Sequence, residues 1–263
     1  MKRLEDKVAI VYGDGSIGGA IARSFSSAGA KVFWAGRTMT KLREIAEEVL
    51  ASGGFIETAR VDALNEKDVD KHFLDVITKA GKIDISFNAI GVSQNGAPDV
   101  PLIELPLEKF FRPISIYAQS HFITARAAAR QMVKQGFGVI LMHTPNASRI
   151  SPPLIGGLVP AWAAMEALCR SLSVECGPNG VRTVCLLTTS IPETPLINEV
   201  WHLRAKSRGV TFEQIHSTIE NMTHRKRLTT LKELTDAAVF VASDEGSAIT
   251  GTIFNLTAGM IVN

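Results

Sequence analysis

The 263-residue sequence is poor in cysteine and has no long apolar run. Its three cysteines, Cys169, Cys176 and Cys185, are odd in number and show no Cys-x-x-Cys spacing, which argues against disulfides and a zinc site and favours a reducing cytosol. No run of about 18 apolar residues predicts a membrane-spanning helix, and residues 1–7 lack an apolar export stretch. We therefore expect a cytoplasmic protein that makes no use of a membrane.

The sequence also lacks a charge excess. Lysine and arginine number 28 against 26 acidic residues, a net charge of +2, which is too small to indicate a nucleic-acid partner. The six histidines are scattered without metal-ligand spacing, so no metal site is predicted. The basic run at 224–227 reads as a solvated loop.

What the sequence does contain is a regular alternation of short apolar bursts and helical periodicity. Continuous apolar runs indicate strands buried on both faces, and strand–helix alternation demands right-handed crossovers with helices on both sides of the sheet. The predicted class is α/β, a doubly wound, Rossmann-type parallel sheet in a single domain over 1–263. The strands are predicted at 8–11, 31–35, 55–61, 83–87, 138–142, 181–187 and 252–255, and the main helices at 17–28, 66–80, 108–134, 162–175 and 231–242.

One segment, from about 188 to 230, carries helical stretches but no strand. An insertion of this length is typical of a lid or a substrate-binding lobe. Its apolar residues suggest an apolar small-molecule ligand, although they would equally serve to pack the lobe onto the body or onto a neighbouring subunit: Leu196, Ile197, Val200, Trp201, Leu203, Ile215 and Met222.

The first strand runs into a Gly-x-Gly-x-x-Gly turn at a strand-to-helix junction. Glycines there permit a tight turn and let a pyrophosphate approach the N–H groups of a helix N-terminus; the alternative is a tight turn without a ligand. The turn consists of Gly13, Asp14, Gly15, Ser16, Ile17 and Gly18. Asp14 would repel a phosphate unless its carboxylate points away. After the second strand, Arg37 could hold a 2′-phosphate, which favours NADP over NAD; otherwise it is an ordinary surface arginine.

With these elements in place, the chain resembles the short-chain dehydrogenase/reductase family over nearly its whole length. The resemblance is carried by Val61-Asp62, by Asn88-Ala89-Ile90-Gly91, by the helix Ala163–Glu175, and by Phe240–Glu245 followed by Ile249-Thr250-Gly251. It implies a seven-stranded sheet, a homotetramer or homodimer joined through the helices near 108–134 and 162–177, and NAD(P)-dependent alcohol or carbonyl chemistry. The implied cofactor-binding residues are Gly13, Gly15, Ser16, Ile17, Gly18, Arg37, Asp62, Asn88 and Gly91.

The resemblance fails at the chemistry. Family members use a tyrosine as general acid and a lysine four residues later that lowers its pKa. The only two tyrosines here, Tyr12 and Tyr117, are followed at that spacing by Ser16 and His121. Alignment on the ungapped helix ending at Glu175 puts Leu158 at the tyrosine position, Trp162 at the lysine position and Pro145 at the catalytic serine position, with Tyr117 at the upstream asparagine position. Leucine, tryptophan and proline cannot supply the proton, the cation or the polarising hydroxyl.

Other polar residues map near the carboxyl ends of the fourth and fifth strands, where ligands bind in such sheets. Tyr117 with His143 is the most plausible replacement acid/base pair, because histidine titrates near neutrality; the alternative is that both residues merely pack. Thr144, Asn146 and Ser148 lie nearby. Three functions remain open: an oxidoreductase with a rebuilt proton relay, a non-catalytic nucleotide-binding or regulatory subunit, and a non-redox lyase or cyclase that uses the same pocket.

Overall fold

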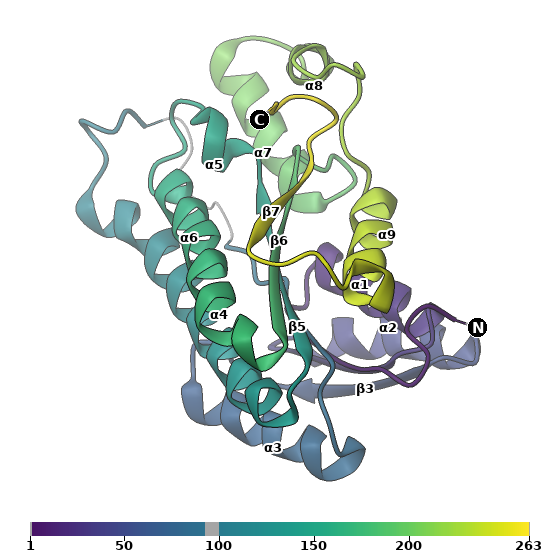
Figure 1. The fold of residues 1–263 in the computed structure, drawn as a ribbon. Coiled ribbons are helices and arrows are strands. Elements are labelled where there is room, and N and C mark those ends of the chain that lie inside the picture. Colours follow the sequence, from purple (N-terminus) through teal and green to yellow (C-terminus); the bar gives the residue numbers. More distant parts are fainter. Residues whose placement is uncertain (1, 93–99, 263) are drawn as a thin grey trace.

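A computed structural model describes residues 2–92 and 100–262 of the chain. Seven strands form one fully parallel sheet in the order β3-β2-β1-β4-β5-β6-β7, which confirms the predicted doubly wound class (Figure 1). The strands are β1 (Val8–Tyr12), β2 (Lys31–Gly36), β3 (Phe55–Arg60), β4 (Ile85–Asn88), β5 (Gly138–Pro145), β6 (Val181–Thr188) and β7 (Thr252–Leu256).

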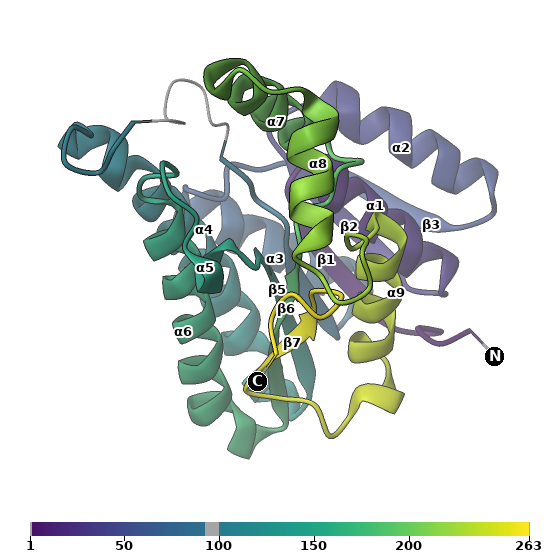
Figure 2. The same cartoon turned by 90° about the horizontal axis from the view of Figure 1, so that it is seen from above.

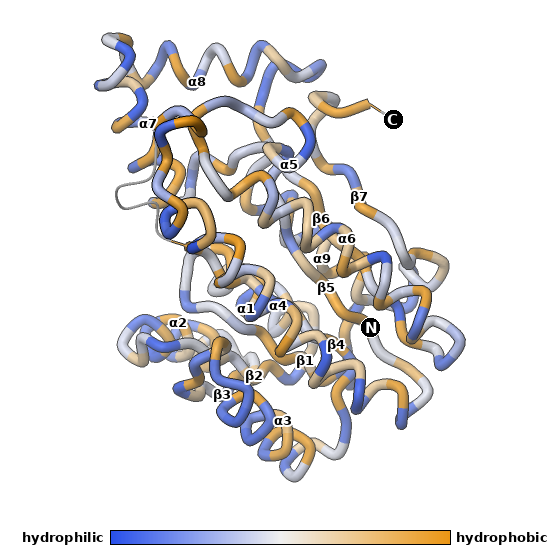
Figure 3. Tube along the Cα trace, turned by 90° about the vertical axis from the view of Figure 1, so that its left-hand side faces the viewer, coloured by the Kyte–Doolittle hydropathy of each residue, from blue (hydrophilic) through white to orange (hydrophobic). Residues whose placement is uncertain are grey.

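Helices cover both faces of the sheet and create two apolar cores. On one face, α1 (Ser16–Ser27), α2 (Met39–Ala51) and α9 (Leu231–Ala242) pack against the strands. On the other lie α3 (Glu66–Ala80), α4 (Leu107–Gln135) and α6 (Leu158–Cys176). In Figure 3 these helices alternate apolar and hydrophilic segments, as expected for helices with one face on a core. The central strands are buried on both faces, which explains their continuous apolar sequences.

Helix boundaries follow the capping residues. Asn65 caps α3 and Gly81 ends it in the left-handed conformation, with φ 76°, while Thr230 and Glu233 form a capping box at the start of α9. Helix α6 begins at Leu158, four residues before the predicted start at Trp162. Pro160 therefore falls in the first turn, where proline is tolerated.

The sheet order reverses at β1, whose neighbours β2 and β4 lead in opposite directions along the sheet. Ligands of doubly wound sheets bind in the crevice at the carboxyl ends of the strands at such a switch point. The insertion between β6 and α9 folds into α7 (Pro195–Arg208) and α8 (Phe212–Asn221), which stand over this edge in Figure 2. We call this segment the lobe.

The two ends of the lobe are fastened to each other. The amide of Thr189 donates to Oγ1 of Thr229 at 3.2 Å, and the amide of Thr229 donates to Oγ1 of Thr189 at 2.7 Å. Both threonines are buried. The lobe therefore leaves and rejoins the body at one point.

Among the described residues, none of the helices combines the length and the hydropathy that crossing a bilayer requires.

Candidate functional site

The glycine turn between β1 and α1 is sterically specified. Gly13 has φ +113°, and a Cβ atom on it would lie 2.7 Å from the carbonyl carbon of Ala89. A Cβ atom on Gly18 would overlap the carbonyl oxygen of Gly13, which also accepts a 2.8 Å hydrogen bond from Nε1 of Trp34. Gly13 and Gly18 therefore shape the turn, Gly18 by leaving room for the carbonyl group of Gly13.

The front of the turn forms an open cradle. Among the described atoms, nothing lies within 4 Å of a Cβ position on Gly15, and the first turn of α1 carries no acidic residue or side-chain cap. Gly13, Gly15, Ser16 and Ile17 line a cleft of about 450 Å³. We call it the switch-point cleft. Backbone N–H groups and the positive end of α1 fit the phosphates of a dinucleotide.

The remaining predicted cofactor residues divide into two groups. Arg37, Asp62 and Gly91 line the switch-point cleft, and Oδ1 of Asp62 accepts a 3.1 Å bond from the amide of Leu64. Asn88 is buried and is not among the described residues that line the cleft. Its Oδ1 accepts from the amide of Ile90 at 2.9 Å and so fixes the loop after β4.

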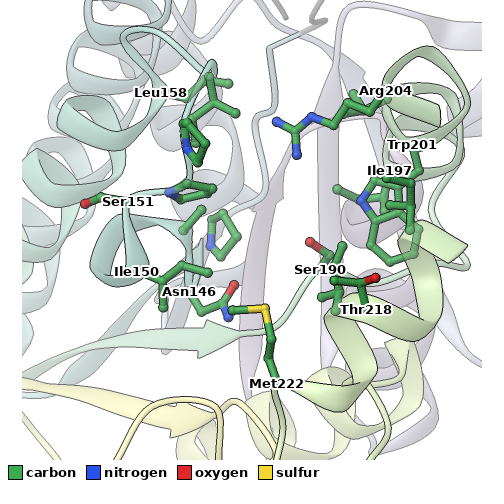
Figure 4. Close-up of a pocket in the computed structure, with 18 of the residues that line it drawn as sticks. Asn146, Ile150, Ser151, Leu158, Ser190, Ile197, Trp201, Arg204, Thr218 and Met222 are labelled. Atoms are coloured by element: carbon green, nitrogen blue, oxygen red, sulfur yellow. The ribbon is translucent and has the colours of Figure 1, made fainter. Parts of the chain in front are cut away.

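An apolar cavity of about 600 Å³ adjoins this cleft, and Leu196 lines both. Figure 4 shows one wall made by the segment that includes Ile150 and Leu158, and the opposite wall made by Ile197 and Trp201 of the lobe, with the guanidinium of Arg204 extending into the space between them. We call it the lobe cavity. The apolar residues predicted in the insertion line this cavity, except Leu203, which is exposed.

The three residues that the sequence alignment predicts at the catalytic positions lie together in the wall of the lobe cavity. Pro145 ends β5, Leu158 begins α6, and Trp162 follows one helical turn later. Together these three side chains present an apolar surface and an indole to the cavity.

Tyr117 on α4 brings the one phenol of the lobe cavity. The rings of Tyr117 and Trp162 lie 6.3 Å apart at 65°. Burial raises the pKa of Tyr117 above its usual value, and the nearby indole of Trp162 and amide of Val92 only partly oppose that effect. Tyr117 is therefore a neutral phenol at neutral pH.

His143 does not line the lobe cavity with Tyr117. Its Nε2 lies 2.9 Å from Oγ1 of Thr188, and burial, assisted by the nearby His121, lowers the pKa of His143 to about 4. Among the described residues that line the lobe cavity, Tyr117 appears and His143 does not. The histidine next to Tyr117 is His121, with ring centroids 6.0 Å apart and a pKa that burial also lowers to about 4. Both histidines are neutral at neutral pH.

The loop after β5 is held by a carboxylate that the sequence reasoning missed. Glu166, buried in α6, accepts from Oγ of Ser148 at 2.5 Å and pairs with Arg149 at 3.0 Å. These contacts anchor the short helix α5 (Ala147–Ile150). The sequence signal was an acidic residue, Glu166, in the stretch 158–169 of α6, whose other residues are apolar. Ser148 thus serves the loop, whereas Asn146 lines the lobe cavity and Thr144 lies 3.3 Å from the sulfur of Cys185.

No group of three or more histidine, cysteine or acidic side chains is placed to hold a metal ion in the part of the chain that the structure describes.

A seven-stranded parallel sheet with a glycine turn at its switch point defines a Rossmann-type α/β protein. A sequence model of the family described as enoyl-(acyl carrier protein) reductase matches residues 11–261. The chain belongs to the short-chain dehydrogenase/reductase family.

Individual relatives extend over nearly the whole chain. An uncharacterized oxidoreductase, YxbG, of Bacillus subtilis is 29% identical over 263 residues, covering 99% of this chain and 93% of its own. The (+)-cis,trans-nepetalactol synthase NEPS1 of Nepeta racemosa is 28% identical over 266 residues, covering 99% and 93%. The solved structure of NAD⁺-bound xylitol dehydrogenase superposes with a TM-score of 0.91 at 22% identity over 98% of this chain and 100% of that one, which supports the fold.

Proposed function

We propose that this chain, a protein of oxidoreductase lineage, binds a nicotinamide dinucleotide in the switch-point cleft and an apolar small molecule bearing one oxygen function in the lobe cavity. We propose further that it does not carry out ordinary carbonyl reduction. The observation that carries this proposal is the pairing of Tyr117 with the indole of Trp162 where the family places an ammonium group.

The residues present fit the dinucleotide. The turn residues Gly13, Gly15, Ser16 and Ile17 would hold the pyrophosphate, and Asp62 would face the adenine side. A bound nicotinamide would supply or accept a hydride at the boundary that Leu196 shares between the cleft and the cavity. Arg37 taken alone favours NADP.

Tyr117 limits what chemistry can follow. A reductase must deliver a proton to the oxygen that the hydride makes basic, and a phenol does so near neutrality only when a cation stabilises its anion. The Trp162 N–H is a neutral donor and gives far less stabilisation than an ammonium group. Tyr117 can therefore polarise and orient a ligand oxygen, but it is a poor proton source.

Two functional classes remain compatible with this site. A nucleotide-binding or regulatory subunit needs only the two adjoining cavities and no proton relay. A non-redox lyase or cyclase would use the apolar cavity to fix the conformation of its substrate and Tyr117 as a fixed hydrogen-bond donor. The similarity to a nepetalactol synthase supports this second class. A cytoplasmic homodimer or homotetramer through α4 and α6 fits the exposed Phe122 and Val174 on those helices.

The test combines binding and turnover. Calorimetry with NADH and NADPH should show binding, and a broad panel of carbonyl substrates should show no turnover. The triple variant Pro145→Ser, Leu158→Tyr, Trp162→Lys, which restores the missing groups, should gain turnover when folded. Robust reduction of simple ketones by the natural chain, lost in Tyr117→Phe, would instead establish a rebuilt relay. Absence of dinucleotide binding would overturn the proposal.

A further inference from the structure

Asp14 belongs to the glycine turn, yet its side chain lies over the end of β2. A Cβ atom built on Gly36 would be 2.7 Å from Cβ of Asp14 and 3.2 Å from its carboxyl carbon. The end of the second strand is where doubly wound proteins read the 2′ position of the adenosine ribose. The space that an acidic side chain at position 36 would take is therefore filled by Asp14.

The Asp14 carboxylate also occupies the positive end of α2. Its Oδ2 accepts a 2.7 Å hydrogen bond from the amide of Thr38, the N-cap residue of that helix. Thr38 has no side-chain cap of its own, and the first turn of α2 carries no acidic residue within the described chain. A 2′-phosphate would need this same N–H group and this same helix end, so the carboxylate stands where the phosphate would bind.

Asp14 carries its charge at neutral pH. Partial burial alone would raise the pKa of the Asp14 carboxyl, but hydrogen bonds from the hydroxyl and amide of Thr38, its own amide and the charge of Lys41 together lower it below its usual value. A carboxylate has about four acceptor sites, so these contacts leave room to accept a ribose hydroxyl.

Two cations in the cleft would attract a 2′-phosphate and oppose this effect. Arg37 and Lys41 line the same cleft, but both side chains are exposed, so their attraction for a phosphate is screened by water and salt. Asp14 is fixed by its hydrogen bonds to Thr38. We therefore expect the repulsion between Asp14 and a 2′-phosphate to exceed the attraction from Arg37 and Lys41.

We propose that Asp14 accepts the 2′-hydroxyl of the adenosine ribose and excludes a 2′-phosphate, so that the chain selects NAD over NADP. This selectivity presupposes the dinucleotide binding proposed above. It reverses the preference for NADP that Arg37 suggested from sequence, because the acidic residue comes from the glycine turn and not from the end of the second strand.

The experiment is calorimetric titration of the full chain with NAD⁺ and NADP⁺ at one fixed salt concentration. The variants are Asp14→Asn, which keeps an oxygen for the Thr38 amide, Asp14→Ser, which keeps a shorter acceptor, and Arg37→Gln. We expect the natural chain to bind NAD⁺ about tenfold or more tighter than NADP⁺, and either Asp14 variant to reduce that ratio by about tenfold. Arg37→Gln should not reduce the ratio, because it removes a cation that would attract a 2′-phosphate.

Each outcome separates the two proposals. Tighter binding of NADP⁺ by the natural chain, or an unchanged ratio in both folded Asp14 variants, overturns the selectivity while leaving dinucleotide binding intact. Failure of the natural chain and the Asp14 variants to bind either dinucleotide overturns the proposed function itself. Adenosine 5′-monophosphate and adenosine 2′,5′-bisphosphate, titrated in the same way, assign the ratio to the ribose position.

Discussion

The substitution Tyr117→Phe tests how much the hydroxyl of Tyr117 contributes to the free energy of unfolding. Tyr117 is 7% exposed, and the indole of Trp162 and the amide of Val92 are the two polar groups that act on the pKa of its hydroxyl. Tyr117→Phe keeps the ring but removes the oxygen that these two donors could use as an acceptor. A buried donor left unpaired costs about 1–3 kcal/mol. Water in the cavity can reach Trp162, which is only partly buried, so the amide of Val92, 6% exposed, should account for most of the loss.

We therefore expect Tyr117→Phe to lower the free energy of unfolding by about 1–3 kcal/mol, measured by urea denaturation with an unchanged m value. The matched control is Trp162→Phe, which removes one donor and leaves the hydroxyl free to turn to water. The two substitutions should be non-additive by about 0.5 kcal/mol or more, because the two side chains are in contact. A Tyr117→Phe protein as stable as the natural chain, or strict additivity in the double variant, would refute the described geometry.

Two further predictions concern the glycine turn and the buried histidines. Gly18→Ala should destabilise the fold by several kcal/mol in thermal unfolding, on the order of overpacking a core, because its Cβ atom would overlap the Gly13 carbonyl. Gly15→Ala should fold normally and lose only dinucleotide affinity in calorimetry. Equal effects of the two substitutions would contradict the open cradle at Gly15. Burial lowers the pKa of His72, His121 and His143 to about 4 from 6.5, so these residues take up protons in the unfolded chain at a higher pH than in the folded chain. The free energy of unfolding should therefore be full above pH 6.5 and fall progressively toward pH 4. A urea midpoint that stays constant over this range would show that the three histidines do not have lowered pKa values.

Most of the fold could be predicted because it depends on local patterns. Apolar runs such as Val8–Tyr12 mark strands buried on both faces, and caps such as Asn65 and Thr230 mark helix starts within the sequence itself. The start of α6 could not be predicted from the family helix alone, since Pro160 does not stop a helix from its first turn.

The site could be predicted only where backbone geometry determines it. Gly13 and Gly18 were found because a Cβ atom at either position would collide with neighbouring backbone atoms. The orientation of Asp14, the contact between Trp162 and Tyr117, and the hydrogen bond from Ser148 to Glu166 depend on side chains that the fold brings together from distant segments. No spacing in the sequence encodes those distances.

The reciprocal hydrogen bonds between Thr189 and Thr229 close the lobe into a loop with joined ends. The two residues are 40 positions apart in the sequence, but they meet at one buried point at the base of the lobe. Substitutions within α7 and α8 can therefore reshape the lobe cavity while Thr189 and Thr229 keep the two ends of the segment joined. The switch-point cleft would sense such substitutions through Thr194 and Leu196, the lobe residues that line it.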